Sequence, residues 1–500
     1  MTQQHKYRLL EQAEPGELAR LQELVRNCNW RQVFHIQPST GLLNDPNGLS
    51  YFNGEYHVFY QWFPLGTEHG MKYWYHLKSQ DCVNWQDVGI GIKPGDPFDS
   101  HGAYSGSAIE HEGKLHLMYT GNTRDAQWVR HPYQCMAVME ADNHITKWEQ
   151  PVIPEVPEGY TDHFRDPKLW KQGEYFYCVI GAQRTNLTGC TVLYRSIDLK
   201  QWEFIGELKT DLQQFGYMWE CPDYFQLDGA GVLLFCPQGL AHQGDHYHNI
   251  YQSGYIIGKP LDVDALQLTH GQFQELDRGF DFYAPQTLLD GQGRRILIGW
   301  MGLPDISYPT DSHGWAHCLT LPRVLSVQDG KLIQQPLPEL ASLRQGEAQH
   351  VNDTLTSHTR SYDHFSGTTY ELKCTFDVLD AEQVGIIFRA KDNEYTVIRY
   401  DVEHHKLVLD RSSSGVPLAT EYEETRQCDL TGKQITLHLF VDVSSVEIFV
   451  NEGEEVFTSR IFPSSQSEGI QFFAQEGSAR LEATIWQLHQ QGHTAKYETR

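Results

Sequence analysis

The sequence of 500 residues predicts an all-β protein: a five-bladed β-propeller, then a C-terminal β-sandwich, with a short helical segment at the N-terminus. Three observations predict this fold. A turn-and-strand unit repeats through the first two thirds of the chain, apolar residues alternate strictly in the last third, and aromatic residues are abundant, with 26 Tyr, 23 Phe and 12 Trp. Aromatic residues favour strands, and a chain of this length exceeds what one core usually serves.

The predicted helical segment comprises residues 1–30. Pro15 is suited to the first position of a helix, and an apolar stripe at helical spacing follows it. The stripe consists of Leu18, Leu21, Leu24 and Val25. Asn27 and Asn29 then interrupt the pattern, so we expect the helix to end there.

The repeats predict the propeller over residues 31–325. A turn followed by an aromatic or aliphatic strand recurs five times, with turn glycines at positions 54, 113, 173, 229 and 291. The steps of 59, 60, 56 and 62 residues each suit a four-stranded blade. The pattern SxDxxxW, at residues 79–85 and 196–202, repeats as well. An ordinary sandwich also has regular turns, so periodicity alone leaves both architectures open.

The last third of the chain predicts the sandwich, over residues 346–500, after a linker at 326–345. Apolar residues alternate along 370–378 and again along 435–443. This period of two indicates strands with one buried face. The linker is inferred from the sequence QQPLPE at its centre.

Charge and cysteine content argue against several classes of function. Asp and Glu outnumber Lys and Arg by 65 to 39, for a formal charge of −26, whereas nucleic-acid binding needs a basic face. The 10 cysteines include no CxxC pair, which favours buried free thiols in a reducing compartment. Neither a signal peptide nor a membrane-spanning stretch is recognisable. We therefore expect a cytoplasmic protein with no nucleic-acid or membrane partner.

Polar motifs precede the turn glycines at similar offsets. Asp45 lies 9 residues before its glycine, Ser105 lies 8 before, Asp166 lies 7 before and Glu220 lies 9 before. Equivalent positions in successive blades face the central channel, so we expect three acids to meet in one funnel. Taken singly, these acids are also explained by a turn, a surface ion pair and a solvated strand residue.

Converging carboxyls are what glycoside cleavage requires. One carboxylate attacks the anomeric carbon while a protonated carboxyl delivers its proton to the departing oxygen. Crowded acids raise one another's pKa, so one of them can stay protonated near neutrality. Glu220 is the expected proton donor, because Trp219, Cys221 and Pro222 around it hydrate poorly.

These motifs resemble those of glycoside hydrolase family 32, the invertases and fructanases. The resemblance rests on FHIQPSTGLLNDPNG at 34–48, FYQW at 59–62, RDP at 165–167, ECP at 220–222, SSVEIFVN at 444–451 and TSR at 458–460. It extends from about residue 30 to 487. It implies the propeller and sandwich, a double-displacement hydrolysis of β-fructofuranosides, and neither a metal nor an organic cofactor.

The resemblance also implies roles for individual residues. Asp45 matches the nucleophile, Asp166 the transition-state stabiliser that holds fructosyl hydroxyls, and Glu220 the general acid/base. A small-molecule sugar is the expected partner. The expected substrate-binding residues are Leu42, Leu43, Asn44, Gln61, His69, Lys72, Trp74, Tyr104, Ser105 and Arg165.

One segment departs from many invertases, which carry WGxxxWGH there. This chain has HGMKYWYH at 69–76, which resembles the bacterial sucrose-6-phosphate hydrolases. His69 replaces a stacking Trp, and Lys72 is an added cation that can attract the phosphate on the leaving glucosyl unit. The usual Phe before Ser105 is Tyr104 here. The expected reaction is retaining hydrolysis of sucrose 6-phosphate, and of sucrose.

Other readings remain open at this point. The chain is alternatively an invertase or fructan hydrolase without phosphate preference, a fructosyltransferase, or a sugar-binding propeller without catalysis. Lys72 is alternatively a solvated surface residue. The histidines of AHQGDHYH at 241–248 match no common zinc spacing, so a polar loop is the expected structure there.

Overall fold

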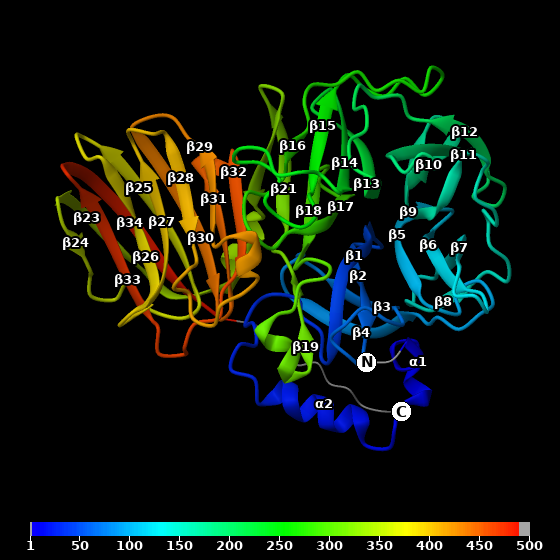
Figure 1. Cartoon of the computed structure of the whole chain (residues 1–500), viewed down its shortest axis with the longest axis horizontal. Coiled ribbons are helices and arrows are strands. Elements are labelled where there is room, and N and C mark those ends of the chain that lie inside the picture. Colours follow the sequence, from blue (N-terminus) through cyan, green and yellow to red (C-terminus); the bar gives the residue numbers. More distant parts are fainter. Residues whose placement is uncertain (1–2, 490–500) are drawn as a thin grey trace.

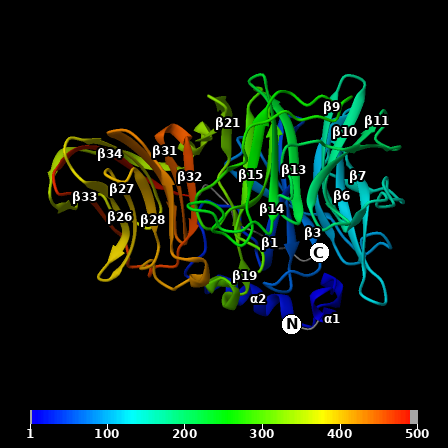
Figure 2. The same cartoon turned by 45° about the horizontal axis from the view of Figure 1, so that its top comes forward.

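The computed structural model describes residues 3–489, so residues 1–2 and 490–500 of the predicted helical segment and sandwich lie outside it. Strands dominate the described chain (Figure 1). Five sheets formed by residues 41–336 occupy one side of the molecule, and two larger sheets occupy the other (Figures 1 and 2). None of the described helices is long and apolar enough to cross a membrane.

The N-terminal segment contains three short helices rather than one. They are α1 (Gln3–Lys6), η1 (Leu10–Gln12) and α2 (Glu17–Arg26). The prediction for Pro15 was wrong: α2 begins two residues later, after Gly16, whose φ of 77° is left-handed and accessible to glycine. Val25 is buried, but Leu24 is 47% exposed, so the apolar stripe is narrower than expected.

The first two sheets follow the predicted repeat. The first contains β1 (Gly41–Phe52), β2 (Glu55–Phe63), β3 (Tyr73–Ser79), β4 (Trp85–Ile92) and the short β19 (Trp315–Ala316), which pairs with β1 in parallel. The second contains β5 (Ala103–His111), β6 (Lys114–Arg124), β7 (Arg130–Met139) and β8 (Ile145–Lys147). Within each sheet, consecutive strands pair in antiparallel order.

The next three sheets repeat this order. The third contains β9 (Tyr160–Gln172), β10 (Tyr175–Arg184), β11 (Gly189–Ser196) and β12 (Glu203–Glu207). The fourth contains β13 (Met218–Leu227), β14 (Ala230–Gln238), β15 (Gly254–Gly258) and β16 (Gln274–Glu275). The fifth contains β17 (Tyr283–Leu289), β18 (Arg295–Met301), β20 (Cys318–Leu319), β21 (Arg323–Gln328) and β22 (Lys331–Pro336), with η2 (Pro309–His313) between β18 and β19.

The first strands of these five sheets contact one another in a closed cycle. β1 contacts β5, β5 contacts β9, β9 contacts β13, β13 contacts β17, and β17 contacts β1. Residues far apart in the sequence are therefore brought together wherever they occupy similar positions on these strands.

The last two sheets each have six strands. One has the order β23–β34–β25–β30–β31–β32 and the other β24–β33–β26–β27–β28–β29. Both contribute to one apolar core, to which the alternating residues of β25 and β30 belong, as predicted. The bounds are β23 (Arg344–Thr356), β24 (Thr359–Arg360), β25 (Tyr370–Val378), β26 (Gln383–Lys391), β27 (Glu394–Asp401), β28 (Lys406–Asp410), η4 (Thr420–Tyr422), β29 (Thr425–Asp429), β30 (Gln434–Asp442), β31 (Ser445–Val450), η5 (Asn451–Gly453), β32 (Glu455–Arg460), β33 (Gly469–Gln475) and β34 (Ser478–Leu488).

The predicted linker, 326–345, contains regular structure. The fifth sheet continues through it, because β21 and β22 form a hairpin, and only η3 (Pro338–Leu343) separates β22 from β23. The sequence QQPLPE suggested a connection because of its two prolines. Its glutamines nevertheless lie on β22, an end strand of the sheet, where a proline at the last position costs no ladder bond.

Buried ion pairs join the five-sheet part to the six-stranded sheets. Arg323, on β21, pairs with Glu447 on β31 at 2.8 Å, and His35 lies 3.1 Å from the same carboxylate. His35 also contacts Asp442, and the two carboxylates raise its pKa to about 9 against the opposing effect of burial. A buried charge that loses its partner destabilises the folded protein strongly, so these pairs fix how the two parts dock.

Candidate active site

Each of the five first strands carries a β-bulge at its polar motif. Strand pairing is interrupted between Leu43 and Pro46, Ala103 and Gly106, Arg165 and Lys168, Glu220 and Asp223, and Tyr283 and Gln286. A bulge leaves residues unpaired and re-aims their side chains. Because the five strands form a cycle, the five bulges meet at one place, as the spacing of the motifs predicted for four of them.

The prolines in or next to the bulges show which positions are equivalent. Asp45, Asp166 and Cys221 each precede a proline, and so does Ala284 in the fifth sheet. Glu220 lies one residue earlier than expected from the turn glycines, in line with Arg165. The offset of 9 residues that Glu220 shares with Asp45 was therefore misleading, because hairpin lengths differ by one or two residues between sheets.

A pocket of about 290 Å³ opens where the bulges meet. It contains all three predicted catalytic acids, and it is strongly polar for a small-molecule site. The residues that line it are Tyr7, Asn44, Asp45, Gln61, His69, Lys72, Tyr104, Arg124, Arg130, Arg165, Asp166, Glu220, Gln238, Tyr251, Tyr283, Trp300, Pro304 and Asp305.

Three donors hold the Asp45 carboxylate. Ser105 donates its hydroxyl to Oδ2, the Asn44 amide donates to Oδ1 at 3.1 Å, and the Cys221 thiol lies 3.5 Å from Oδ2. Burial raises the pKa of Asp45, and the nearby Glu220 raises it further, while the bond from Ser105 opposes both. These contacts fix the orientation of the carboxylate, which still faces the pocket.

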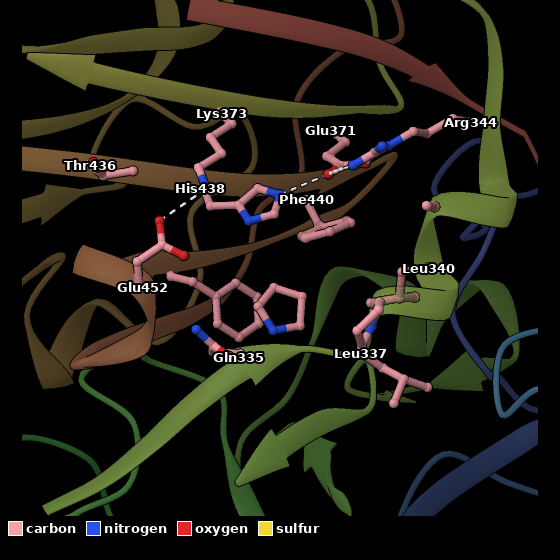
Figure 3. A pocket seen from close by; sticks show the side chains of 14 residues that line it. Gln335, Leu337, Leu340, Arg344, Glu371, Lys373, Thr436, His438, Phe440 and Glu452 are labelled. Atoms are coloured by element: carbon pink, nitrogen blue, oxygen red, sulfur yellow. Dashed lines mark hydrogen bonds and ion pairs between the residues drawn. The ribbon is translucent and has the colours of Figure 1, made fainter. Parts of the chain in front are cut away.

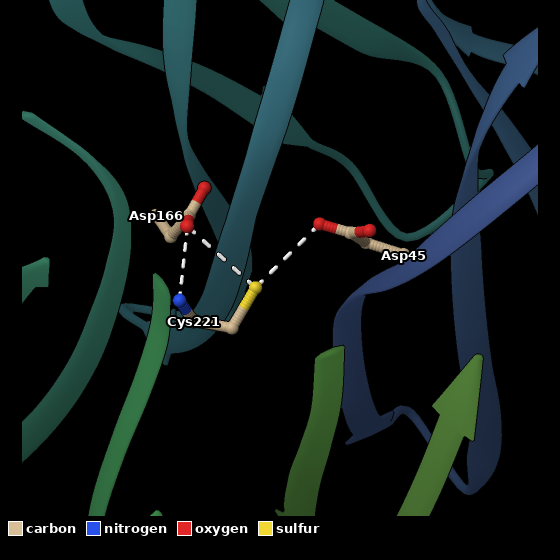
Figure 4. Close-up of side chains that lie close together, drawn as sticks. All are labelled: Asp45, Asp166 and Cys221. Atoms are coloured by element: carbon tan, nitrogen blue, oxygen red, sulfur yellow. Dashed lines mark hydrogen bonds between the residues drawn. The ribbon is translucent and has the colours of Figure 1, made fainter. Parts of the chain in front are cut away.

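Asp166 is held against Cys221 (Figure 4). The backbone N–H of Cys221 donates to Asp166 Oδ2 at 2.9 Å, and the thiol lies 3.6 Å from the same oxygen. Asp166 has a left-handed φ of 68°, and its own N–H donates to the Thr120 hydroxyl. Burial, and then Glu220, raise the pKa of Asp166 to about 7, although Arg165 opposes this. Near neutrality, Asp166 is therefore still partly protonated.

Glu220 is the most strongly bonded of the three acids. Arg165 donates to Oε1 through Nε at 2.9 Å and Nη2 at 2.7 Å, while Tyr283 and Gln238 donate to Oε2 at 2.6 and 2.9 Å. Burial raises the pKa of Glu220, but Arg165 and Tyr283 outweigh burial, and the net pKa is lowered. The expectation that poorly hydrating neighbours raise the pKa of Glu220 is therefore not met, because Arg165 and Tyr283 bond directly to its carboxylate.

Lys72 is the first member of a series of buried side chains, linked by hydrogen bonds, beside Asp45. Its Nζ donates to Asn44 Oδ1 at 2.8 Å, the Asn44 amide donates to Gln61 at 2.7 Å, and Gln61 donates to Ser105 at 2.5 Å. Lys72 is only 2% exposed, so it is not a solvated surface lysine. Burial lowers its pKa to about 7, although Asp45 opposes the shift.

The structure divides the ten predicted substrate-binding residues into two groups. The first group lines the pocket and consists of Asn44, Gln61, His69, Lys72, Tyr104 and Arg165. Ser105 is buried and does not line the pocket itself, but it donates a hydrogen bond to Asp45, which does. Leu42, Leu43 and Trp74 do not line the pocket. All three are buried in apolar cores, and the Trp74 indole donates to the backbone oxygen of Tyr104. Adjacent residues of a strand point to opposite faces, so motif neighbours need not share a site.

Nine lining residues were missed, and four of them matter most for the chemistry. Tyr283 and Gln238 bond to Glu220, and Arg124 and Arg130 face the pocket from the ends of β6 and β7. A signal for Tyr283 was present, because YAP at 283–285 repeats the RDP and ECP pattern in the fifth unit. Nothing in the repeat marks the two arginines.

One group of potential metal ligands lies in the same pocket. One ligand atom each from Asp45, Asp166 and Cys221 lies within 4.8 Å of the others. The histidines of the loop 241–248 bond elsewhere: His246 lies 3.0 Å from Glu275, and His248 lies 3.1 Å from Glu423.

A second pocket, of about 220 Å³, lies between η3 and one of the six-stranded sheets, the one that contains β25 and β30 (Figure 3). Its charged groups are paired with one another. Glu371 accepts from Arg344 at 2.7 Å and lies 2.8 Å from His438, and Lys373 pairs with Glu452 at 2.9 Å. This pocket contains none of the three predicted acids, so the pocket at the bulges is the candidate active site.

Two family models match nearly the whole chain. The N-terminal domain of glycosyl hydrolases family 32 matches residues 35–336, and the C-terminal domain of that family matches residues 339–487. Among curated proteins, the sucrose-6-phosphate hydrolase of Staphylococcus xylosus is 48% identical over 489 residues, or 97% of this chain and 98% of that protein. The enzyme of the same name from Bacillus subtilis is 43% identical, over 94% of this chain and 97% of that protein.

Solved structures agree with these relatives. The sucrose-6-phosphate hydrolase of Lactobacillus gasseri has a TM-score of 0.91 and 38% identity, covering 98% of this chain and 99% of that chain. A variant of the Bombyx mori GH32 beta-fructofuranosidase BmSUC1, solved in complex with sucrose, has a TM-score of 0.79 and 32% identity, covering 96% and 99%. From the family models, the relatives and the pocket, we conclude that this chain is a glycoside hydrolase and belongs to family 32.

Proposed function

We propose that this protein hydrolyses the β-fructofuranosidic bond of sucrose 6-phosphate with retention, giving fructose and glucose 6-phosphate, and that it also accepts sucrose. The observation that carries this is the meeting of Asp45, Asp166 and Glu220 in one polar pocket. Two carboxyls with different environments are the machinery of glycoside cleavage. Relatives named sucrose-6-phosphate hydrolase, similar over almost their full length, support the phosphorylated substrate.

The architecture that we propose is a five-bladed β-propeller with a C-terminal β-sandwich. The cycle of first strands supports the propeller, and the core shared by two six-stranded sheets supports the sandwich. We place the boundary between the domains in η3, at Pro338–Leu343. This boundary agrees with the ends of the two matched family models, at residues 336 and 339.

In the proposed mechanism, Asp45 attacks the anomeric carbon of the fructosyl unit. Ser105 and Asn44 hold the carboxylate in one orientation, which reduces the entropic cost of attack. Lys72 and the side chains linked to it by hydrogen bonds lie on the same side, so we place the fructosyl hydroxyls there. Asp166, beside Asp45, accepts hydrogen bonds from those hydroxyls, and these bonds strengthen as positive charge develops on the ring.

Glu220 is the proposed acid, and it must gain a proton before the leaving group departs. Arg165 lowers the pKa of Glu220, whereas burial and Glu220 raise the pKa of Asp166 to about 7. A substrate hydroxyl that bonds to Arg165 weakens its hold on Glu220 and raises the pKa of that carboxyl. Tyr283 and Gln238 keep the carboxyl in place, and Glu220 later takes a proton from the water that releases fructose.

Comparing substrates side by side tests this proposal. Purified enzyme is given sucrose, sucrose 6-phosphate and a short fructan, and products are separated over time. We expect kcat/KM to be highest for sucrose 6-phosphate, with fructose released and few transfer products. Equal values for both sucroses would indicate an invertase, fructosylated sugars as main products would indicate a transferase, and binding without turnover would indicate a lectin-like protein.

We also propose a cytoplasmic location. All 10 cysteines are buried and unpaired, which suits a reducing compartment. Hydrolysis of a sugar phosphate fits that location, because phosphorylated sugars do not cross lipid without a carrier. Apart from this small-molecule substrate, we propose neither a nucleic-acid nor a membrane partner. Fractionation of cells that produce the protein, followed by activity measurement in each fraction, tests the location.

A further inference from the structure

Two arginines face each other at the rim of the active-site pocket. Arg124 ends β6 and Arg130 begins β7, and the two residues pair across the hairpin. Both line the pocket, and both are half-buried. Tyr7, from the N-terminal segment, lines the same part, and its ring lies 5.5 Å from that of Trp128 in the hairpin loop.

Neither guanidinium has a carboxylate partner within residues 3–489. No ion pair includes either residue, and Nε of each is buried without a hydrogen bond. Arg124 has one long bond, from Nη1 to the Trp128 carbonyl at 3.4 Å. The acid in the loop, Asp125, is already engaged, because it lies 3.0 Å from His131 and accepts from the N–H of Val129 at 2.8 Å.

Two uncompensated cations are unexpected in this protein. The chain carries a formal charge of −26, and more deeply buried arginines are compensated, by carboxylates at Arg165 and Arg323 and by close backbone carbonyls at Arg389 and Arg460. Like charges at paired positions repel each other, and burial adds a cost. An anionic ligand between them removes both penalties. Arginine also suits phosphate in particular, because its planar fork binds two oxygens at once.

The arginines lie on the leaving-group side of the site. Their strands, β6 and β7, contact β9, whose Arg165 binds Glu220, the proposed acid, whereas Lys72 bonds to Asn44 beside the proposed nucleophile. The glucosyl unit leaves from the side where Glu220 delivers its proton. Its phosphate is therefore expected near Arg130 and away from Lys72.

We propose that Arg124 and Arg130 bind the phosphate of the leaving glucosyl unit and set the preference for phosphorylated sucrose. This inference rests on the proposed function, and it replaces the role that the sequence suggested for Lys72. Lys72, buried and bonded to Asn44, is instead a positioning residue on the fructosyl side.

The variants Arg124→Gln, Arg130→Gln and the double variant test this assignment. The readout is the ratio of kcat/KM for sucrose 6-phosphate to that for sucrose, which cancels any effect common to both substrates. Each single change is expected to lower the ratio roughly tenfold, and the double change roughly a hundredfold, the scale of charge-assisted hydrogen bonds. Inhibition by glucose 6-phosphate should weaken in parallel, while inhibition by glucose should not.

Arg184→Gln is the matched control. Arg184 ends β10, as Arg124 ends β6 in the neighbouring sheet, but Glu207 pairs with it at 2.6 Å and it does not line the pocket. Its ratio should equal that of the wild type. Lys72→Met is the competing variant, and a larger fall in its ratio than in the double arginine variant would overturn the proposal.

Failure of this inference can be distinguished from failure of the proposed function. If the wild type prefers sucrose 6-phosphate and the double arginine variant keeps that preference, the inference is wrong and the function stands. If the wild type has no preference, the proposed substrate is wrong. In that case glucose 6-phosphate still decides the inference: if it inhibits the wild type no better than glucose does, the arginines do not form a phosphate site.

Discussion

Replacing Asp166 with asparagine should stabilise the protein while inactivating it. Asp166 is 5% exposed, and its pKa of about 7 lies about 3 units above the ordinary value of 3.8. Each unit corresponds to about 1.4 kcal/mol, so the ionised carboxylate costs the native state at most about 4 kcal/mol. Asparagine is uncharged and can still accept the Cys221 N–H, so it removes this cost and keeps the bond.

The pH dependence of this effect has a definite sign. Between pH 4 and 7 the native protein retains the Asp166 proton and the unfolded chain does not, so rising pH lowers stability in this window. The variant lacks this loss. We expect Asp166→Asn to be more stable than the wild type by about 1–4 kcal/mol at pH 8, with the gap shrinking toward zero near pH 4.

Urea unfolding at pH 5 and pH 8 measures both gaps. Asp81→Asn provides a control of opposite sign, because amides of Asn84 and Val83 outweigh burial and lower the pKa of Asp81. That variant should be less stable than the wild type by about the same amount at pH 5 and pH 8, because the Asp81 contribution is lost only below about pH 4. If Asp166→Asn shows the same gap at both pH values, or is the less stable protein at pH 8, its carboxylate does not carry the inferred cost.

Four further predictions concern catalysis. Asp45→Asn and Glu220→Gln should each lower kcat by roughly a thousandfold or more in a folded protein. A substrate with a good leaving group should restore activity only to Glu220→Gln. A loss of only a few-fold in either variant would contradict the role assigned to that residue. NMR of the first product should show fructose with the anomeric configuration of the substrate, whereas inversion would refute the nucleophile. Hg²⁺, bound by Cys221 between the two aspartates, should inhibit the wild type much more strongly than an active Cys221→Ala variant, and equal inhibition would place the metal elsewhere. The alkaline limb of kcat should lie at higher pH with sucrose 6-phosphate than with sucrose, and coincident limbs would contradict the coupling argued below.

Much of the fold could be predicted because each sheet repeats one local signal. The hairpin between first and second strands needs a tight turn, so its glycine recurs at nearly constant spacing, as at Gly54 and Gly113. In the fifth hairpin the left-handed residue is Gly293 rather than Gly291, yet the count of units was unaffected. Asp81 and Asp198, in the two SxDxxxW segments, both accept loop amides, so this echo also reported a real turn.

The details of the site were less predictable, because they depend on packing across sheets. Spacing placed Glu220 with the aspartates, but a one-residue difference in hairpin length put Cys221 in that position. Burial of Leu42 and Leu43 follows from neighbours contributed by distant segments. The relative acidity of Glu220 and Asp166 was also hidden, because Arg165 reaches Glu220 across 55 residues of sequence and leaves Asp166 as the weaker acid.

The charges in the pocket connect substrate choice to catalysis. Arg130 lowers the pKa of Glu220, as Arg165 does, and a general acid that is too easily ionised delivers its proton poorly. A phosphate bound between Arg124 and Arg130 neutralises that field, so the Glu220 carboxyl regains its proton when the phosphorylated substrate is in place. Unphosphorylated sucrose lacks the neutralising charge and leaves Glu220 more ionised at the same pH. The arginines therefore favour sucrose 6-phosphate in two ways: they bind its phosphate, and the bound phosphate raises the pKa of Glu220. This is why the alkaline limb of kcat is expected at higher pH with sucrose 6-phosphate than with sucrose.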